Sequence, residues 1–436
     1  MVENKVPSRV ERKIPSRAER VLWELSRGGH RAYVIGEAAL EFLEGDPTYR
    51  VDILTDAGLD VVLRKYPQAE VIQGTSPRVE LHQEQASKST RYISLDPDVD
   101  TSIRISFFPK EQPLREALRG QGLSLNAIAL RYNGIPYDPF NGYDDFKAKI
   151  LRLVCDPDEY FQEDPLRLLQ VISFACTDGF KLDTSTTEAI KRNAHLAAGL
   201  NAYPEFRKII RSDRVTWGLK LMVDLHLMDY LIPEIIPCIG FRVKKGDLWQ
   251  HTLTVISKSC PAEKLRLAAL FHDVGKPLCR EVTPRGKEHF PRHSQIGQEI
   301  AERRLTELGF PQDVVEAVGK LVRYHMYKKM GVKTYKKLYL EFDGRLLDLL
   351  DLFRADGATE GEMRRLEQVE RHAMRYGTPF RYAQLAVTWQ EVAGWIASTG
   401  AELSRVMRQL LLWVYEHSED NTKERLRWYY ENYLRP

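Results

Sequence analysis

Short apolar runs and amphipathic segments alternate over the first 150 residues. Runs rich in β-branched residues and bounded by turn residues predict strands, and apolar spacings of three and four predict helices. A Pro-Ser pair, an amphipathic segment and a closing glycine predict a helix within residues 1–28. The strand candidates that follow are "RAYVIG", "RVDILT", "AEVIQG" and "SIRISFF". This alternation predicts an α/β head over residues 29–150.

Strand signals largely stop after residue 150, and helical spacing takes over. It runs through "DPLRLLQVISFAC", "STTEAIKRNAHLAAGL", "DRVTWGLKLMVDL", "EKLRLAALFHDVG" and "SQIGQEIAERRLTELG". We therefore expect an α+β protein with a long helical body. The expected segments are an N-terminal helix (1–28), the head (29–150), a helical neck (151–240), a histidine-rich helical domain (241–375) and a helical tail (376–436).

Composition is that of a globular protein of several domains. The 436 residues are 43% hydrophobic and 29% charged, and no apolar run approaches the roughly 20 residues of a membrane span. The charged N-terminus lacks the apolar core of a secretory signal. Five scattered cysteines without a Cys-x-x-Cys pair indicate reduced thiols. We expect a cytoplasmic protein with no membrane partner.

Net charge is only +3, but basic residues gather between Ala317 and Leu338. This stretch holds three tyrosines and no acid. Basic side chains bind phosphates and aromatic rings can stack on bases, which indicates RNA binding. A solvated helix face followed by a lysine-rich loop would have the same composition. The seven candidate RNA-binding residues are Lys320, Arg323, Lys328, Lys329, Lys333, Lys336 and Lys337.

Histidines and aspartates cluster in the helical segments of the middle third. A single histidine on an apolar helix is usually a core residue, whereas a set of six or more in one region indicates a metal site. Imidazole and carboxylate ligands suit Mn, Fe, Co, Ni or Zn. The candidates are His251, His272, Asp273, His289, His293, His325 and Asp356.

The predicted strand "RVDILT" carries one acidic residue, Asp52, behind a turn that contains Gly36. Nucleotidyl transfer uses two Mg²⁺ ions, which need carboxylates close together. Residues i and i+2 of a strand point to the same side, so an acid-x-acid pair would hold these ions. Here Arg50 occupies the other position. Its permanent positive charge would repel a metal and could pair with Asp52.

The head resembles that of the bacterial tRNA nucleotidyltransferase (CCA-adding) and poly(A) polymerase family. That family shows a Gly-Gly pair and, at a fixed distance, Asp-x-Asp. Gly36 matches the first glycine and Asp52 the second metal carboxylate, while Glu37 and Arg50 replace the other two. The family's Arg-Arg-Asp is Gly-Gln-Gly at residues 120–122. The resemblance thus implies a nucleotidyltransferase fold whose metal site is weakened or silenced.

Further motifs of the same family follow the head. "SLNAIAL", with Asn126, resembles the family's Thr-Ile-Asn-Ala-Leu-Ala, and "FQEDPLRLLQVISFA" its Glu-Asp-x-x-Arg motif. In the family this motif pairs with the incoming ATP or CTP. The resemblance therefore implies nucleotide binding by Glu163, Asp164 and Arg167, with the last two on one helix face.

The order His…His-Asp…Asp, with "FHDVGKP" at its centre, resembles the HD metal-dependent phosphohydrolases. The resemblance implies that one metal, such as Ni, Mn, Co, Fe or Zn, is held by four ligands. It also implies that Lys276 faces phosphate and that His293 and His325 line the site or hold a second metal. The implied ligands are His251, His272, Asp273 and Asp356.

One branch of the CCA-adding family carries an HD domain behind its head, and its tail, which grips the tRNA acceptor stem and elbow, resembles the end of this chain. We therefore expect a protein that binds RNA at the tRNA 3′ end. Its head would be degenerate, and its HD site would hydrolyse a phosphomonoester, a 2′,3′-cyclic phosphate or a nucleotide.

Two alternatives remain. In the first, the head is an active Mg²⁺-dependent nucleotidyltransferase or poly(A) polymerase that adds CMP or AMP to RNA 3′ ends. Its missing carboxylate would come from Glu37, Asp46, Asp98 or Asp100. In the second, the chain is a non-catalytic RNA-binding protein.

Overall fold

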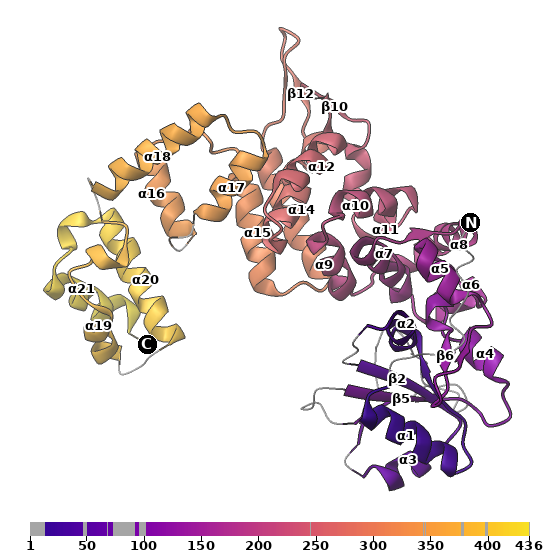
Figure 1. Ribbon diagram of the computed structural model, residues 1–436. Helices are drawn as coiled ribbons and strands as arrows, with labels where there is room; N and C mark the ends of the chain where they lie inside the picture. Colours follow the sequence, from indigo (N-terminus) through magenta and orange to yellow (C-terminus); the bar gives the residue numbers. More distant parts are fainter. Residues whose placement is uncertain are drawn as a thin grey trace. The chain divides into compact units, whose positions relative to one another are not determined.

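The chain divides into two compact units in a computed structural model (Figure 1). The model describes residues 14–46, 50–67, 69–72, 92–95, 102–244, 246–342, 344, 346–375, 379–396 and 400–435. The first unit comprises the described residues up to Ile236 and the segment Glu307–Phe310, and the second comprises the rest. No helix in the described part of the chain is both long and apolar enough to cross a bilayer.

A seven-stranded sheet forms the core of the head, with the strand order β3-β4-β5-β2-β1-β6-β7. β2 pairs with β1 in the antiparallel sense and with β5 in the parallel sense. Figure 1 shows β2 and β5 side by side. β1 is entirely buried because helices α1 and α2 pack against the sheet. The strands are β1 (Ala32–Ile35), β2 (Arg50–Thr55), β3 (Glu70–Ile72), β4 (Tyr92–Leu95), β5 (Ser102–Phe107), β6 (Ala129–Leu130) and β7 (Pro136–Tyr137).

Two helices of the first unit begin at an aspartate that caps them. Asp156 caps α6 by accepting from the backbone N–H groups of Asp158 and Glu159, and Asp183 caps α8 in the same way. The helices are α1 (Ser16–Arg27), α2 (Gly36–Glu44), α3 (Leu59–Lys65), α4 (Leu114–Arg119), α5 (Gly142–Ala148), α6 (Pro157–Glu163), α7 (Leu166–Asp178), α8 (Thr184–Asn193), α9 (Tyr203–Arg211), α10 (Val215–Asp224) and α11 (Met228–Leu231).

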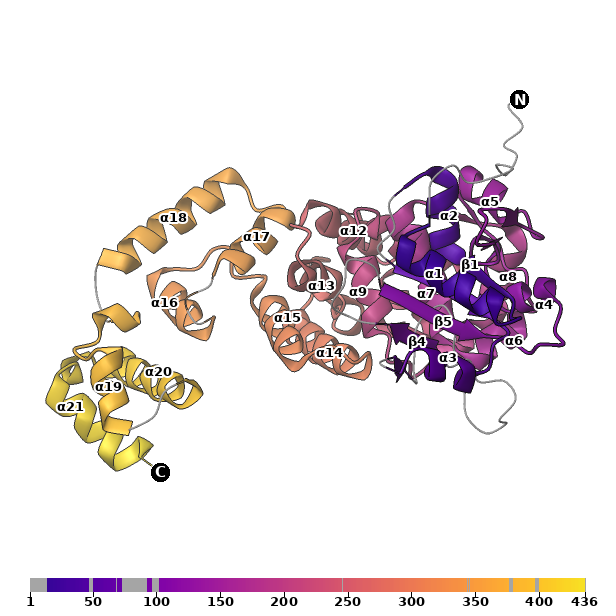
Figure 2. The same ribbon diagram turned by 60° about the horizontal axis from the view of Figure 1, so that its bottom comes forward.

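The second unit is helical and is built around α13, which packs against α12, α15 and α17 (Figure 2). α13 is buried on all sides from Leu265 to Phe271, as expected for a central helix. The helices are α12 (Leu248–Lys258), α13 (Glu263–Phe271), α14 (His293–Glu307), α15 (Gln312–Tyr324), α16 (Val332–Glu341), α17 (Leu347–Ala355), α18 (Glu360–Arg375), α19 (Trp389–Ile396), α20 (Ala401–Glu416) and α21 (Lys423–Tyr429).

The predicted α+β class is confirmed, and the helices predicted after residue 150 are present. The same part of the chain also contains strands of two residues each, which pair two by two. The sequence pattern did not predict these strands. They are β8 (Ile150–Leu151) with β9 (Lys181–Leu182), β10 (Arg242–Val243) with β11 (Gly246–Asp247), and β12 (Glu281–Val282) with β13 (Glu288–His289). The division into five segments stays a prediction.

Candidate metal centre

The buried end of α13 presents His272 and Asp273 to the interior of the second unit. The Nδ1 atom of His272 lies 2.8 Å from the carbonyl oxygen of Ala269. A carbonyl only accepts, so Nδ1 carries the proton and donates it. Nε2 is therefore left with its lone pair toward the centre, as a metal-binding imidazole requires.

His293 and His325 repeat this arrangement. Their Nδ1 atoms each lie 2.7 Å from a backbone carbonyl three residues earlier, those of Phe290 and Val322. The backbone thus fixes the same tautomer in three histidines from different parts of the chain. All three present Nε2 as a metal ligand atom.

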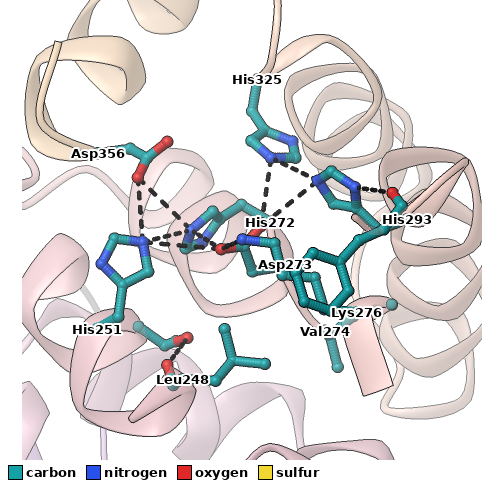
Figure 3. Close-up of polar contacts among 12 residues, drawn as sticks. Leu248, His251, His272, Asp273, Val274, Lys276, His293, His325 and Asp356 are labelled. Carbon is teal, nitrogen blue, oxygen red and sulfur yellow. Dashed lines mark hydrogen bonds and ion pairs between the residues drawn. The ribbon is translucent and has the colours of Figure 1, made fainter. Parts of the chain in front are cut away.

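Three side chains, those of His251, His272 and Asp356, gather at one side of Asp273 (Figure 3). His251 Nε2 lies 3.1 Å from Asp356 Oδ1, 3.4 Å from His272 Nε2 and 3.7 Å from Asp273 Oδ2. His272 Nε2 lies 3.2 Å from Asp273 Oδ2. α12, the end of α13 and the end of α17 therefore bring together the four ligands that the HD resemblance implied.

A second group lies at the other oxygen of Asp273. The Nε2 atoms of His293 and His325 are 3.3 Å apart, and each lies 3.5 Å from Asp273 Oδ1. Figure 3 shows both rings directed at this oxygen. Asp273 is thus shared by two sets of three donors, and the donors of each set lie within 4.8 Å of one another.

These residues fit a divalent metal. Ligand atoms about 2.1 Å from a metal lie roughly 3 to 3.5 Å from one another, close to the separations found here. Asp273 Oδ1 is also buried without a hydrogen-bond partner within the described part of the chain. Such an oxygen is costly unless a cation satisfies it.

The electrostatics favour the metal-binding forms of His293 and of the two carboxylates. Burial lowers the pKa of His293 to about 4, so this imidazole is neutral at pH 7. Burial opposes ionisation of Asp273 and Asp356, but neighbouring imidazoles and lysines outweigh it and hold both pKa values below the usual range. Burial likewise opposes protonation of His272, yet the two carboxylates raise its pKa. The centre is thus strongly attractive to cations.

Two lysines reach the ligand carboxylates. Lys276 Nζ lies 2.5 Å from Asp273 Oδ2, and Lys328 Nζ lies 2.5 Å from Asp356 Oδ2 and 2.9 Å from the backbone oxygen of Asp356. Lys328 therefore faces the metal centre, and its role in RNA binding stays a prediction. Sequence analysis missed this contact since the partners are 28 residues apart.

The other residues of the basic stretch differ in exposure. Lys336 is only 4% exposed and its Nζ lies 5.1 Å from the ring centre of Phe380, so its prediction as an RNA-facing residue is wrong. Lys320 donates to the backbone oxygen of Glu341, and Arg323 is half-buried. The exposed lysines are Lys329, Lys333 and Lys337, whose RNA-binding role stays a prediction.

His289 lies apart from the sets of metal-ligating donors found in the described residues. It is at the end of the β12–β13 hairpin, where its Nε2 lies 2.9 Å from Glu281 Oε2.

In the head, Asp52 is held by an arginine that sequence analysis did not identify. Arg104 Nε donates to Asp52 Oδ1 over 2.7 Å, and Nη2 donates to Oδ2 over 3.0 Å. The β2–β5 register places the two residues opposite each other. The arginine and aspartate side chains are 16% and 14% exposed. The alternating pattern of "SIRISFF" was the available signal, since it puts Arg104 on a defined face.

Asp52 belongs to no group of three or more metal-ligating donors found in the described residues. Asp46 and Glu37 are both exposed. Asp98 and Asp100 lie outside the described residues. Arg50 is exposed at the start of β2.

The implied nucleotide-binding residues form two close groups. Gly36 has a φ of +64°, and a Cβ there would lie 3.7 Å from Asn126 Oδ1. The buried Arg167 donates to Glu163 Oε2 over 3.1 Å, and its Nε lies 3.8 Å from Asp164 Oδ2. Asp164 does not share a helix with Arg167. It lies in the break between α6 and α7, where it accepts from the Leu166 N–H group.

Comparison with known proteins identifies the family. The CC-adding tRNA nucleotidyltransferase of Thermus thermophilus is 32% identical over 329 residues, which are 70% of this chain and 75% of that protein. The chain belongs to the tRNA nucleotidyltransferase family. The A-adding tRNA nucleotidyltransferase of Deinococcus radiodurans is 29% identical over 58% of this chain and 62% of its own length.

Domain and fold comparisons agree with this family. The HD domain family matches residues 247–360, and the family described as the probable RNA and SrmB-binding site of polymerase A matches residues 179–239. The CCA-adding enzyme of Bacillus stearothermophilus, solved with CTP, shares the fold with a TM-score of 0.58. It is 22% identical, and the alignment covers 94% of this chain and 95% of that one. The family resemblance read from the sequence is therefore confirmed.

Proposed function

We propose that this family member binds the 3′ end of tRNA and hydrolyses a phosphoester at its HD centre. The single observation that carries the reaction is the convergence of His251, His272 and Asp273, whose donor atoms lie within 4.8 Å of one another, with Asp356 Oδ1 3.1 Å from His251 Nε2 and 3.9 Å from His272 Nε2. Family membership supports the RNA partner, since the relatives are named for their action on tRNA.

The residues of the centre divide the work. A bound divalent metal would polarise the phosphoryl oxygen and lower the pKa of a coordinated water. His251, His272, Asp273 and Asp356 would hold it, and the metal is of the Mn, Fe, Co, Ni or Zn type. Lys276 attracts the phosphate to the same place. His293 and His325 bind a second metal or accept a proton at Nε2.

The head then serves RNA and nucleotide binding. The guanidinium of Arg104 occupies the oxygens of Asp52 that a Mg²⁺ ion would need. Asp164 and Arg167, whose side chains lie 3.8 Å apart, would bind the nucleotide. Asp52 is therefore a structural residue in this proposal.

Nucleotidyl transfer is the second candidate, and the comparisons favour it over a silenced head. The relatives are named as CC-adding, A-adding and CCA-adding enzymes, and one solved relative holds CTP. In this case the carboxylate of Asp52 would leave the Arg104 guanidinium and bind Mg²⁺ instead. The chain would then add CMP or AMP from CTP or ATP.

Two assays on the same variants separate the candidates. Phosphate release is measured from a short RNA that ends in a 3′-phosphate, and ring opening to a phosphomonoester is measured from an RNA that ends in a 2′,3′-cyclic phosphate. Incorporation of labelled CMP and AMP is measured on tRNA lacking its 3′ end. The proposal predicts phosphate release that Asp273→Asn abolishes and Asp52→Asn leaves intact. Incorporation that Asp52→Asn abolishes, without phosphate release, would establish the second candidate. Salt-sensitive RNA binding without either activity would indicate a non-catalytic protein.

A further inference from the structure

Two ammonium groups border the metal centre from different elements. Lys276 follows α13 in the turn Lys276–Leu278, and Lys328 lies in the turn after α15. Each Nζ lies 2.5 Å from a carboxylate oxygen, on Asp273 and Asp356 respectively. Both lysine side chains are 16% exposed, so each remains accessible from solvent. The HD motif accounts for Lys276, but it assigns nothing to Lys328.

The charges of the carboxylates and lysines at the centre balance. Asp273 and Asp356 carry one negative charge each, and the two lysines cancel them. Near the turn that holds Lys328, the carboxylate of Glu362 lies 3.8 Å from the ammonium group of Lys329. An imidazole that coordinates an ion is neutral, so one divalent ion would leave the centre with a net charge of about +2.

Both lysines keep hydrogen-bond donors for a further partner. Lys has three donors and no acceptor, and Lys276 uses one of them on Asp273 while Lys328 uses two on Asp356. Two ammonium groups and a divalent ion match a terminal phosphate, which offers three oxygens and a charge near −2 above its second pKa of about 6.

We propose that Lys328 is a substrate-binding residue, and that with Lys276 it selects dianionic terminal phosphates over monoanionic phosphodiesters. This inference rests on the proposed HD phosphohydrolase and narrows its substrate to a phosphomonoester, at an RNA 3′ end or on a free nucleotide. A 2′,3′-cyclic phosphate is a diester with one charge and leaves one ammonium group uncompensated.

The reaction balances without a further reactant. The oxygen of a water molecule bonds to phosphorus, the bond from phosphorus to the ester oxygen breaks, and that oxygen leaves with a proton supplied by the water. The products are inorganic phosphate and a free hydroxyl group.

Binding is tested with the metal-loaded full chain at pH 8, using inorganic phosphate and dimethyl phosphate as probes in calorimetry. Wild type should bind phosphate at least about tenfold more tightly than dimethyl phosphate. Lys328→Met should weaken phosphate binding about 10- to 100-fold, the range for loss of a charged hydrogen bond, and Lys328→Arg should restore part of it. Lys258→Met, an exposed lysine on α12, is the matched control.

Metal content measured on the same samples separates this role from a structural one. If Lys328 binds substrate, Lys328→Met keeps its metal and loses phosphate affinity. Equal binding of the two probes, or unchanged phosphate binding by Lys328→Met, would overturn the inference.

Hydrolysis tests the inference separately from the proposed function. The specificity constant kcat/KM is compared for an RNA 3′-phosphate, a nucleoside monophosphate and a 2′,3′-cyclic phosphate. Preference for the cyclic diester would refute the inference and leave the phosphohydrolase standing. Phosphate-selective binding that depends on Lys328, without hydrolysis of any substrate, would support the inference and refute the proposed reaction.

Discussion

Replacement of Arg104 by methionine tests whether Asp52 is a structural residue. The substitution removes both hydrogen bonds, of 2.7 and 3.0 Å, from a pair whose side chains are 16% and 14% exposed. Loss of one partner costs about 3–5 kcal/mol for a fully buried pair and about 0–1 kcal/mol for an exposed one. With solvent screening at this partial exposure, we expect the head to lose about 2–3 kcal/mol.

A chain of two units need not unfold in one transition, so the stability of the head is measured separately. Hydrogen exchange of the β2 and β5 amides in the full chain gives the free energy of opening of this part of the head. Arg64→Met is the matched control, since its partner Asp60 and Arg64 itself are 74% and 75% exposed. The double variant Asp52→Leu/Arg104→Met should recover part of the loss, as apolar replacement of both partners leaves no buried charge. If Arg104→Met proves as harmless as Arg64→Met, the reasoning fails and Asp52 is available to a metal.

Three further predictions concern the second unit and the core. A divalent transition metal at about 100 times its dissociation constant should stabilise the second unit, of about 200 residues, by about 2.7 kcal/mol. Calorimetry should show its Tm rising by roughly 5–10 °C, and Asp273→Asn should abolish the rise. In filter binding across a salt series, Lys337→Met should weaken tRNA binding and Lys336→Met should not, because only Lys337 is exposed. Burial raises the pKa of Cys176 to about 12, so iodoacetamide at pH 8 should label the exposed Cys260 first, as read by mass spectrometry; prior labelling of Cys176 would contradict its placement.

Local signals predicted much of the fold and of the metal centre. Strands β1, β2 and β5 are short segments rich in β-branched and other apolar residues, and such segments predict strands. The adjacent His272 and Asp273 form one compact motif at the end of a helix. These strands and this motif are determined by residues close together in the chain, so they can be predicted from one sequence.

Contacts between distant residues could not be predicted in this way. Asp52 and Arg104 are 52 residues apart and meet only through the register of two parallel strands. Lys328 belongs to a basic run in sequence, yet the turn after α15 directs it to Asp356. Asp164 and Arg167 lie close together, but they do not share a helix face as expected, because Asp164 lies in the break before α7 and accepts from the Leu166 N–H group.

The central claim is that this chain's chemistry resides at the HD centre. The most direct measurement is the mass of a tRNA transcript bearing a 3′-terminal phosphate after incubation with the protein, a divalent transition metal, Mg²⁺, CTP and ATP. We predict loss of one phosphate group with no added nucleotide, and an unchanged transcript with Asp273→Asn. A transcript lengthened by CMP or AMP residues, to the same extent with Asp273→Asn, would contradict the account.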